Sequence, residues 1–217
     1  CDAIHINLSK IDEGKAVEKV VSMAKQSNIK LISYISGASV AEKNRWFEMI
    51  DNKYRAEQVI MQSGIPYLIF RPTWFFFFLL LMVRDGKAIV IGKQKKPYQW
   101  IAADDYARML TTAYQDEKMR NKIFYIVGKE KYTMKDALAL YCEAIHPRIK
   151  KVTTMPVWLL RLIAKLTGND ELKNATDLFA YFEKVNEFAD GAETNQLLGE
   201  PEITFQKWLD MKKDEKK

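Results

Sequence analysis

The chain has 217 residues, of which 48% are hydrophobic and 29% are charged. This size and composition predict one large folded domain, or one and a half small ones, with a sizeable core. Two cysteines and two histidines, far apart in the sequence, exclude a disulfide framework and argue against a zinc site. We therefore expect a protein without a bound metal in a reducing, cytoplasmic compartment.

The net charge of +6 allows two interpretations. A basic protein binds nucleic acid or an anionic surface when its cations gather on one face. Here the excess lies in short lysine and arginine runs and in a lysine-rich C-terminal tail, which favours an ordinary solvated surface. A mildly positive cleft would also suit a cofactor that carries phosphate groups. We expect neither nucleic acid nor a membrane as a partner.

Strands and helices alternate in the first third of the chain. In chain order, the pattern predicts a strand at 1–8, a helix at 9–27, a strand at 29–36, a helix at 46–63 and a strand at 65–70. Glu13 is expected on the outward, charged face of the first helix. The last strand lacks polar alternation, which is typical of a strand covered on both faces, and Arg71-Pro72 should end it. The alternation predicts an α/β fold with a doubly wound parallel sheet.

Residues 74–83 are almost entirely apolar and include four consecutive phenylalanines. The stretch is about half of the roughly 20 residues that a membrane-spanning helix needs. We expect a buried helix or the wall of a substrate pocket. No signal peptide is visible.

The rest of the chain is increasingly helical. Further strands are predicted at 88–91, 98–102, 122–127 and 150–154, and further helices at 104–115, 133–145, 156–166, 170–188 and from 204 onward. Expected caps are Asp104 or Asp105, Thr133 and Thr204, with Gly168 closing one helix and a short turn at 194–198. We expect an α/β part at residues 1–128 and a mainly helical substrate-side cap at 129–217.

An ordered set of motifs carries a family resemblance. Lys53 and Glu57 form a Lys-x3-Glu pair on the second helix, Ser63-Gly64 ends that helix, and the next strand runs into Arg71-Pro72-Thr73. Residues 100–107 and Leu197-Leu198-Gly199 fit as later pieces. In this order the motifs resemble the NmrA-like group of atypical short-chain dehydrogenase/reductase proteins, over nearly the whole chain. The resemblance implies a Rossmann-like domain that binds NAD or NADP.

One hallmark of such domains is missing. The nine glycines are scattered, and none forms the glycine-rich turn that holds the cofactor pyrophosphate. By the resemblance, the first strand here matches the fourth strand of the family fold. We therefore expect an N-terminally truncated piece of a longer protein that binds dinucleotide poorly. A true short variant, with the edge of its first strand exposed, is the alternative.

The resemblance also implies site residues. The family pairs a tyrosine acid with a lysine four residues later, but Met49 precedes Lys53 at that distance, as a non-tyrosine often does in the atypical group. Candidate catalytic residues are Lys53, Ser36 and Tyr34. The candidate cofactor-binding residues follow the first three strands or lie on the second helix, and they are Asn7, Leu8, Ser9, Ser36, Gly37, Ala38, Lys53, Arg71, Pro72, Thr73 and Trp74.

Each candidate also has an ordinary structural interpretation. Lys53 could be a solvent-facing helix residue, Ser36 to Ala38 a simple turn, Ser9 a helix cap and Pro72 a strand stop. His5, inside the first strand, is expected to be a packed core histidine.

The implied function is reduction of a small carbonyl or quinone-like substrate by an NAD(P)-dependent monomer or homodimer. The alternative is a non-catalytic NAD(P)-sensing regulator that binds a partner protein, which the missing tyrosine favours. A deep apolar pocket beside residues 71–75 would favour the enzyme. A nucleic-acid binder is a third hypothesis and needs lysines on one face with exposed aromatic side chains.

Overall fold

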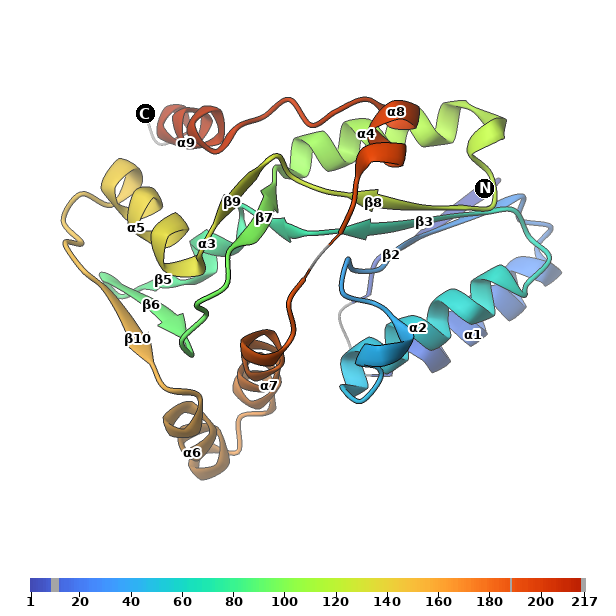
Figure 1. The fold of residues 1–217 in the computed structure, drawn as a ribbon. Helices are drawn as coiled ribbons and strands as arrows, with labels where there is room; N and C mark the ends of the chain where they lie inside the picture. Colours follow the sequence, from blue (N-terminus) through green and yellow to red (C-terminus); the bar gives the residue numbers. More distant parts are fainter. Residues whose placement is uncertain (9–11, 188, 216–217) are drawn as a thin grey trace. The chain divides into compact units, whose positions relative to one another are not determined.

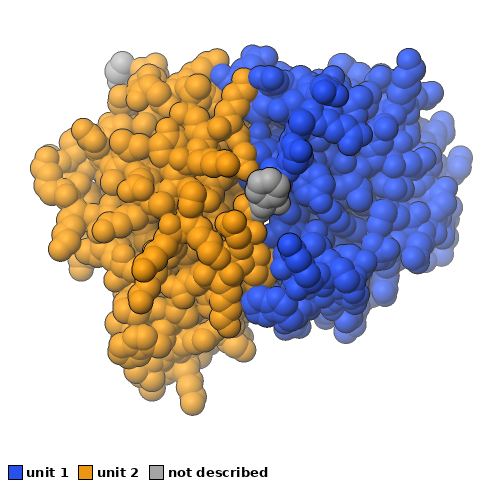
Figure 2. Space-filling view, in the orientation of Figure 1, with its two compact units in different colours: residues 1–73, 104–127, 188–202 blue, residues 74–103, 128–187, 203–217 orange. Residues whose placement is uncertain are grey.

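A computed structural model describes residues 1–8, 12–187 and 189–215. It contains two compact units, each assembled from separate parts of the sequence (Figure 2). Unit 1 comprises Cys1–Thr73, Asp104–Val127 and Phe188–Glu202, and unit 2 comprises Trp74–Ala103, Gly128–Glu187 and Ile203–Lys217. The expected functional division at residue 128 stays a prediction.

Unit 1 is built on a four-stranded sheet in the order β1-β2-β3-β8, with every neighbouring pair parallel. The helices α1 and α2 cover one face of this sheet, and α4 covers the other (Figure 1). This confirms the predicted α/β fold with a doubly wound parallel sheet. The elements are β1 (Ala3–Ile6), α1 (Glu13–Gln26), β2 (Leu31–Ile35), α2 (Glu48–Met61), β3 (Tyr67–Pro72), α4 (Ala103–Gln115), β8 (Lys122–Ile126) and α8 (Ala192–Leu198), with 3₁₀ turns at Glu42–Asn44 and Glu117–Met119.

The core of unit 1 explains why its strands lack polar alternation. Alternate strand residues point to opposite faces, and both faces are covered by helices. Toward α1 and α2 the sheet presents Ile32 and Ile69, which are completely buried. Toward α4 it presents Phe70, whose ring lies 5.9 Å from that of Tyr106 and 5.6 Å from that of Phe124.

Unit 2 contains two three-stranded sheets, β10-β6-β5 and β4-β7-β9, each with one parallel and one antiparallel pair. Its strands are β4 (Trp74–Phe75), β5 (Val83–Arg84), β6 (Lys87–Ile91), β7 (Tyr98–Ile101), β9 (Glu130–Tyr132) and β10 (Val152–Met155). Its helices are α3 (Phe78–Leu81), α5 (Met134–Ile145), α6 (Val157–Thr167), α7 (Asp170–Lys184) and α9 (Phe205–Asp214). The helices α6 and α7 form a hairpin, in which Gly168 takes the left-handed conformation that ends α6 (φ 62°).

Several local predictions were wrong. Asp104 and Asp105 lie inside the first turn of α4 rather than capping it, and buried Asp105 accepts a bond from the backbone nitrogen of Glu202 (2.9 Å). The predicted turn at 194–198 is part of helix α8. The expected caps Thr133 and Thr204 are confirmed, because each side chain accepts a bond from a backbone N–H of its first helical turn.

The third strand ends at Pro72, as predicted, but Arg71 and Pro72 both belong to it and pair with Tyr125 and Ile126 of β8. The Pro72 carbonyl accepts a bond from the Ala38 N–H (3.0 Å), whereas its missing N–H leaves the strand without a donor toward β2 at its last position. The apolar stretch at 74–83 is not one buried helix. It divides into β4 and the one-turn helix α3, and Leu81 is 72% exposed.

Two side-chain orientations also differ from the prediction. Glu13 is buried rather than outward, at 2% exposure, because Lys53 supplies a cation from another helix. His5 is exposed rather than packed in the core, and its Nδ1 lies 2.7 Å from the Ser33 hydroxyl. Neither partner can be inferred from spacing along the chain.

Candidate functional site

The carboxyl ends of β1, β2 and β3 lie together at one edge of the unit 1 sheet, where open α/β sheets bind their ligands. The segment after β2 continues beside β3. Ser36 donates its backbone N–H to Phe70 (2.7 Å), and Ala38 donates to Pro72 (3.0 Å). The next strand end is joined in the same way, since Thr73 donates to the Ile126 carbonyl (3.0 Å). The structure therefore brings the predicted segments 36–38 and 71–73 together.

Lys53 reaches this edge from α2. Its side chain is 17% exposed, so it is not a solvent-facing helix residue. The Nζ atom lies 3.0 Å from Glu13 Oε1 and 3.5 Å from the Ile35 carbonyl oxygen, at the end of β2. It also lies 5.4 Å from the centre of the Tyr34 ring. An ammonium group is thus held next to Ser36 by a carboxylate from α1.

Burial dominates the electrostatics around this lysine. Burial raises the pKa of Glu13 above its usual range, and the nearby Lys53 partly offsets that rise. Burial and then the negative charge of Glu13 strongly raise the pKa of Tyr34. The Tyr34 side chain is fully buried on the face of the sheet that α1 and α2 cover. Its hydroxyl therefore stays protonated at neutral pH.

A second ion pair ties the same helix to β3. Arg71 Nε donates to Glu57 Oε1 (2.9 Å), and a second guanidinium nitrogen donates to Oε2 of the same carboxylate. The phenolic oxygen of Tyr125 accepts a third bond from the guanidinium (2.5 Å). Glu57 is completely buried. Lys53 and Glu57, one turn apart, therefore anchor α2 to α1 and to β3, which gives the Lys-x3-Glu and Arg-Pro motifs a structural meaning.

The sequence did not identify two members of these networks. Glu13 carried no signal, because an acidic residue in the first turn of a helix is usually exposed. Glu57 belonged to a motif, but its partner Arg71 lies 14 residues away and meets it only in the folded unit.

The edge of the sheet presents polar groups beside open space. Among the described residues, the Ser36 Oγ is buried and has no hydrogen-bond partner. A Cβ added to the neighbouring Gly37 would meet no described atom within 4 Å. With the Lys53 ammonium group, the edge offers a hydroxyl, a cation and open space, which suit ribose hydroxyls or a carboxamide.

Three predicted residues are not described as part of this cluster. Ser9 lies outside the described residues. The side chain of Asn7 is exposed. Trp74 belongs to unit 2, where its indole packs against the rings of Phe78 and Phe182 at centroid distances of 5.2 and 4.9 Å. The cofactor-binding role of all three stays a prediction.

Unit 2 contains an apolar cavity of about 400 Å³. Trp74 and Phe179 line it, and their rings stack with centroids 6.2 Å apart. The remaining lining residues are almost all aliphatic or aromatic: Phe78, Leu81, Met82, Arg84, Ile89, Ile91, Met155, Leu160, Leu172, Ala175 and Leu178. Among the described residues, the buried Nε1 of Trp74 has no hydrogen-bond acceptor. Such a cavity has the size and character of a small-molecule site.

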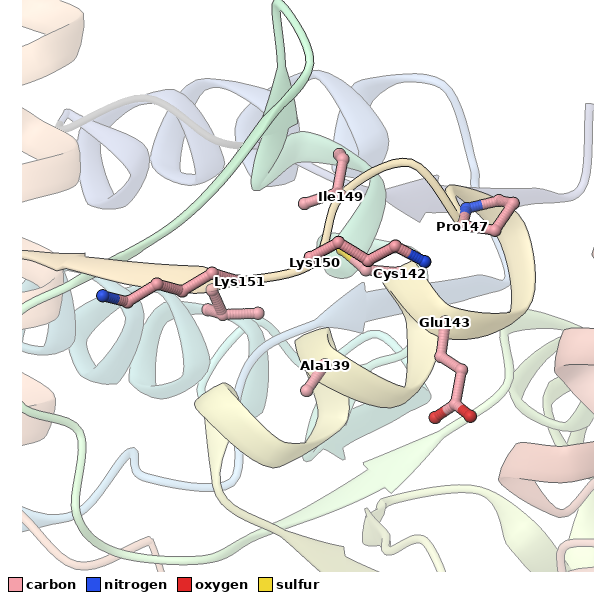
Figure 3. A pocket seen from close by; sticks show the side chains of 8 residues that line it. Ala139, Cys142, Glu143, Pro147, Ile149, Lys150 and Lys151 are labelled. Atoms are coloured by element: carbon pink, nitrogen blue, oxygen red, sulfur yellow. The ribbon is translucent and has the colours of Figure 1, made fainter.

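A second cavity of unit 2, of about 370 Å³, is more polar (Figure 3). Cys142 and Glu143 line it from α5, and Lys150 and Lys151 line it from the segment just before β10. In the figure the two lysine amines point in opposite directions, and the Glu143 carboxylate points away from both. Its polar groups do not converge, so we assign no ligand to it.

Two negative findings apply to the part of the chain that the structure describes. No helix there is long and apolar enough to cross a membrane. No three histidine, cysteine, aspartate or glutamate side chains there gather in a way that could hold a metal ion.

Comparison with known proteins agrees with this fold. The photosystem II assembly factor Ycf39 of Trieres chinensis is 24% identical over 185 residues, which are 82% of this chain and 57% of the relative. The chain thus spans about half the length of the curated relatives that it matches. An NADPH-dependent quinone oxidoreductase from Escherichia coli, solved with NADPH, superposes with a TM-score of 0.75 at 18% identity, covering 97% of this chain and 76% of that one.

A nucleoside-diphosphate-sugar epimerase from Staphylococcus aureus superposes equally well, with a TM-score of 0.75 at 19% identity, over 96% of this chain and 76% of that one. At this identity the likeness shows the fold alone. The model of the NAD(P)H-binding family matches residues 1–117, more than half of the chain. With the parallel sheet and its carboxyl edge, this match establishes that the chain belongs to the NAD(P)H-binding family, as its resemblance to the NmrA-like atypical short-chain proteins predicted.

Proposed function

We propose that the protein is an NAD(P)H-dependent reductase of a small carbonyl or quinone-like substrate. One observation carries the proposal: the Ser36 hydroxyl, which has no hydrogen-bond partner among the described residues, directly follows the Ile35 carbonyl that the Lys53 ammonium group approaches (3.5 Å). Buried polar groups without partners are rare and are usually explained by a ligand or water. The chain belongs to an NAD(P)H-binding family, so the cofactor is the natural partner for these groups.

The cofactor supplies the hydride, and the residues at the edge supply position and charge. Lys53, fixed by Glu13, would hold the ribose of the nicotinamide half through its ammonium hydrogens. The Ser36 hydroxyl can donate a hydrogen bond to a ribose or substrate oxygen on which negative charge develops. Tyr34 is a weaker candidate for proton donation, because its hydroxyl is buried beside Glu13 and its pKa is strongly raised.

The apolar cavity of unit 2 supports an aromatic or aliphatic substrate. A flat ring would stack on Trp74 or Phe179, and the free indole N–H would suit a carbonyl oxygen. The Escherichia coli neighbour is a quinone oxidoreductase, which makes quinones the first substrates to try. The sequence predicted that an apolar pocket beside residues 71–75 would favour an enzyme, and Trp74 lines this one.

The test is a cofactor titration of the chain and of a form extended upstream in its natural reading frame. Nicotinamide fluorescence reports binding of NADPH and NADH. Quinone reduction is measured as the loss of NAD(P)H absorbance at 340 nm. We expect the extended form to bind and turn over. Ser36→Ala and Lys53→Met should each weaken binding by about tenfold, the equivalent of one hydrogen bond to a charged or polar partner.

The matched controls are Ser22→Ala and Lys19→Met, which remove the same groups from exposed positions on α1. Both should bind like the parent protein. If Ser36→Ala and Lys53→Met also leave affinity unchanged while the fold is intact, the site is not at this edge of the sheet.

A second function has its own support. Met49 stands where the reductase tyrosine is expected, and the relative from Trieres chinensis is named an assembly factor rather than an enzyme. The alternative is therefore a non-catalytic NAD(P)-sensing protein that binds a partner protein. It is favoured if the extended form binds cofactor but reduces no carbonyl or quinone, and if cofactor changes which protein it retains.

A further inference from the structure

The outer face of α6 in unit 2 is unusually apolar. Trp158, Leu162 and Leu166 recur at intervals of four residues, so they form one stripe along the helix. They are exposed to 68%, 47% and 78%. Single exposed apolar residues are ordinary, but a tryptophan and two leucines in one row are not. The opposite side of the helix is buried in unit 2 through Leu160 and Ala164.

Positive charge runs beside this stripe. Arg161 and Lys165, also four residues apart, form the adjacent row, and α6 contains no acidic residue. Asp177 of α7 pairs with Arg161, while no ion pair of Lys165 is found among the described residues. An apolar row with tryptophan, flanked by cations, is the pattern of helices that lie in the headgroup region of a membrane.

The charge of the whole unit agrees with this pattern. Unit 2 carries 20 lysine and arginine residues against 12 aspartate and glutamate residues, a net charge of +8. Unit 1 carries 14 against 16, a net charge of −2. The excess charge of the protein is therefore confined to the unit with the apolar stripe. Each cation near an anionic membrane contributes about 1 kcal/mol to binding.

The helix that carries the stripe also borders the apolar cavity of unit 2, on its opposite side. Leu160, on the buried side of α6, lines that cavity, and so does Leu81 of α3, which is 72% exposed. Leu80 and Phe77, each 41% exposed, extend the apolar surface around α3. The lining of the cavity thus includes one strongly exposed apolar side chain, Leu81.

We propose that unit 2 docks on an anionic lipid surface through the exposed face of α6. This replaces the expectation of no membrane partner, which rested on the shortness of the apolar stretch at 74–83. A second copy of the chain fits the same face less well, because two units of net charge +8 would repel each other. The inference stands apart from the proposed reductase activity.

The test is flotation of the 217-residue chain with phosphatidylcholine vesicles, with or without added phosphatidylglycerol, an anionic lipid. We expect binding to the anionic vesicles, weaker binding in high salt, and a blue shift of tryptophan fluorescence. Trp158→Ala should lower the vesicle partition coefficient at least about fivefold. The matched control is Trp46→Ala, an equally exposed tryptophan (58%) in unit 1, which should change nothing.

A charge pair completes the test. Lys165→Glu should weaken binding to anionic vesicles, whereas Lys19→Glu on α1 of unit 1 should not. The proposal is overturned if the parent chain ignores anionic vesicles or if Trp158→Ala binds them as the parent does. It is also overturned if sedimentation velocity shows Trp158-dependent self-association in place of lipid binding.

Discussion

Glu57→Gln is the most informative perturbation of unit 1, because it removes one charge from a buried ion pair and keeps the side-chain volume. The carboxylate is completely buried, its partner Arg71 is 12% exposed, and they share two hydrogen bonds. The glutamine amide has one accepting oxygen in place of the two carboxylate oxygens. Its NH₂ group is a donor and would face an N–H of the Arg71 guanidinium, so one hydrogen bond is lost. The lost charged bond is worth about 1.5–3 kcal/mol. The uncompensated Arg71 charge brings the expected total to about 3–5 kcal/mol.

Urea unfolding followed by circular dichroism measures this loss. Since small domains are stable by about 5–15 kcal/mol, Glu57→Gln should shift the transition strongly or prevent folding. The control is Asp85→Asn, which breaks the fully solvated Arg84–Asp85 pair and should leave the midpoint unchanged.

A double variant separates the energetic effect of the ion pair from the effect of side-chain packing. Glu57→Leu with Arg71→Met removes both charges, and it should cost less than Glu57→Gln alone, because no charge is left buried without a partner. A loss below about 1 kcal/mol for Glu57→Gln would refute the claim that this ion pair anchors α2 to β3.

Three further predictions concern single sites. Gly128→Ala should unfold unit 2, because its Cβ would lie 1.7 Å from the Trp100 carbonyl oxygen, and thermal unfolding measures the loss. Thr133→Ala should cost about 1 kcal/mol in urea, because the side chain caps α5 at Asp136 N (3.1 Å), while Thr133→Ser should retain most of that stability. The His5 ring is exposed on one side, but the neighbouring strand partly desolvates it where its Nδ1 faces Ser33, and this desolvation lowers its pKa from 6.5. Its contribution to stability is therefore present above pH 6.5 and is lost as the pH falls through the folded-state pKa. Proton NMR titration should show the lowered pKa, and in His5→Gln the corresponding pH dependence of the urea midpoint should disappear; an unshifted titration would contradict the partial desolvation.

The carboxyl edge was predictable because parallel strands must end together. Alternating strands and helices imply a parallel sheet. The backbone of such a sheet places Ser36, Ala38 and Thr73 at one edge, independently of their side-chain contacts. The caps at Thr133 and Thr204 were predictable for a similar reason, since a cap depends on its own residue and the next three.

Contacts between distant segments were not predictable. The sequence predicted that Glu13 faces outward, because helical periodicity indicates which residues share a face. Periodicity does not indicate that Lys53 of another helix will pair with Glu13 and allow it to be buried. Asp105 was expected to be a cap because aspartate often caps helices. Its actual partner, the backbone nitrogen of Glu202, is almost a hundred positions away and could not be inferred from the local sequence.

The sequence by itself determined the α/β class, the alternation of strands and helices in the first third of the chain, the family, and the segments that end at the carboxyl edge of the sheet, because these follow from local periodicity and short motifs. Only the tertiary structure decided that Lys53 and Glu57 are held in buried ion pairs, that the Ser36 hydroxyl has no partner among the described residues, and that Trp158 is exposed. Pairing and burial depend on what the rest of the chain packs against each residue, and one strand or helix alone does not contain that information.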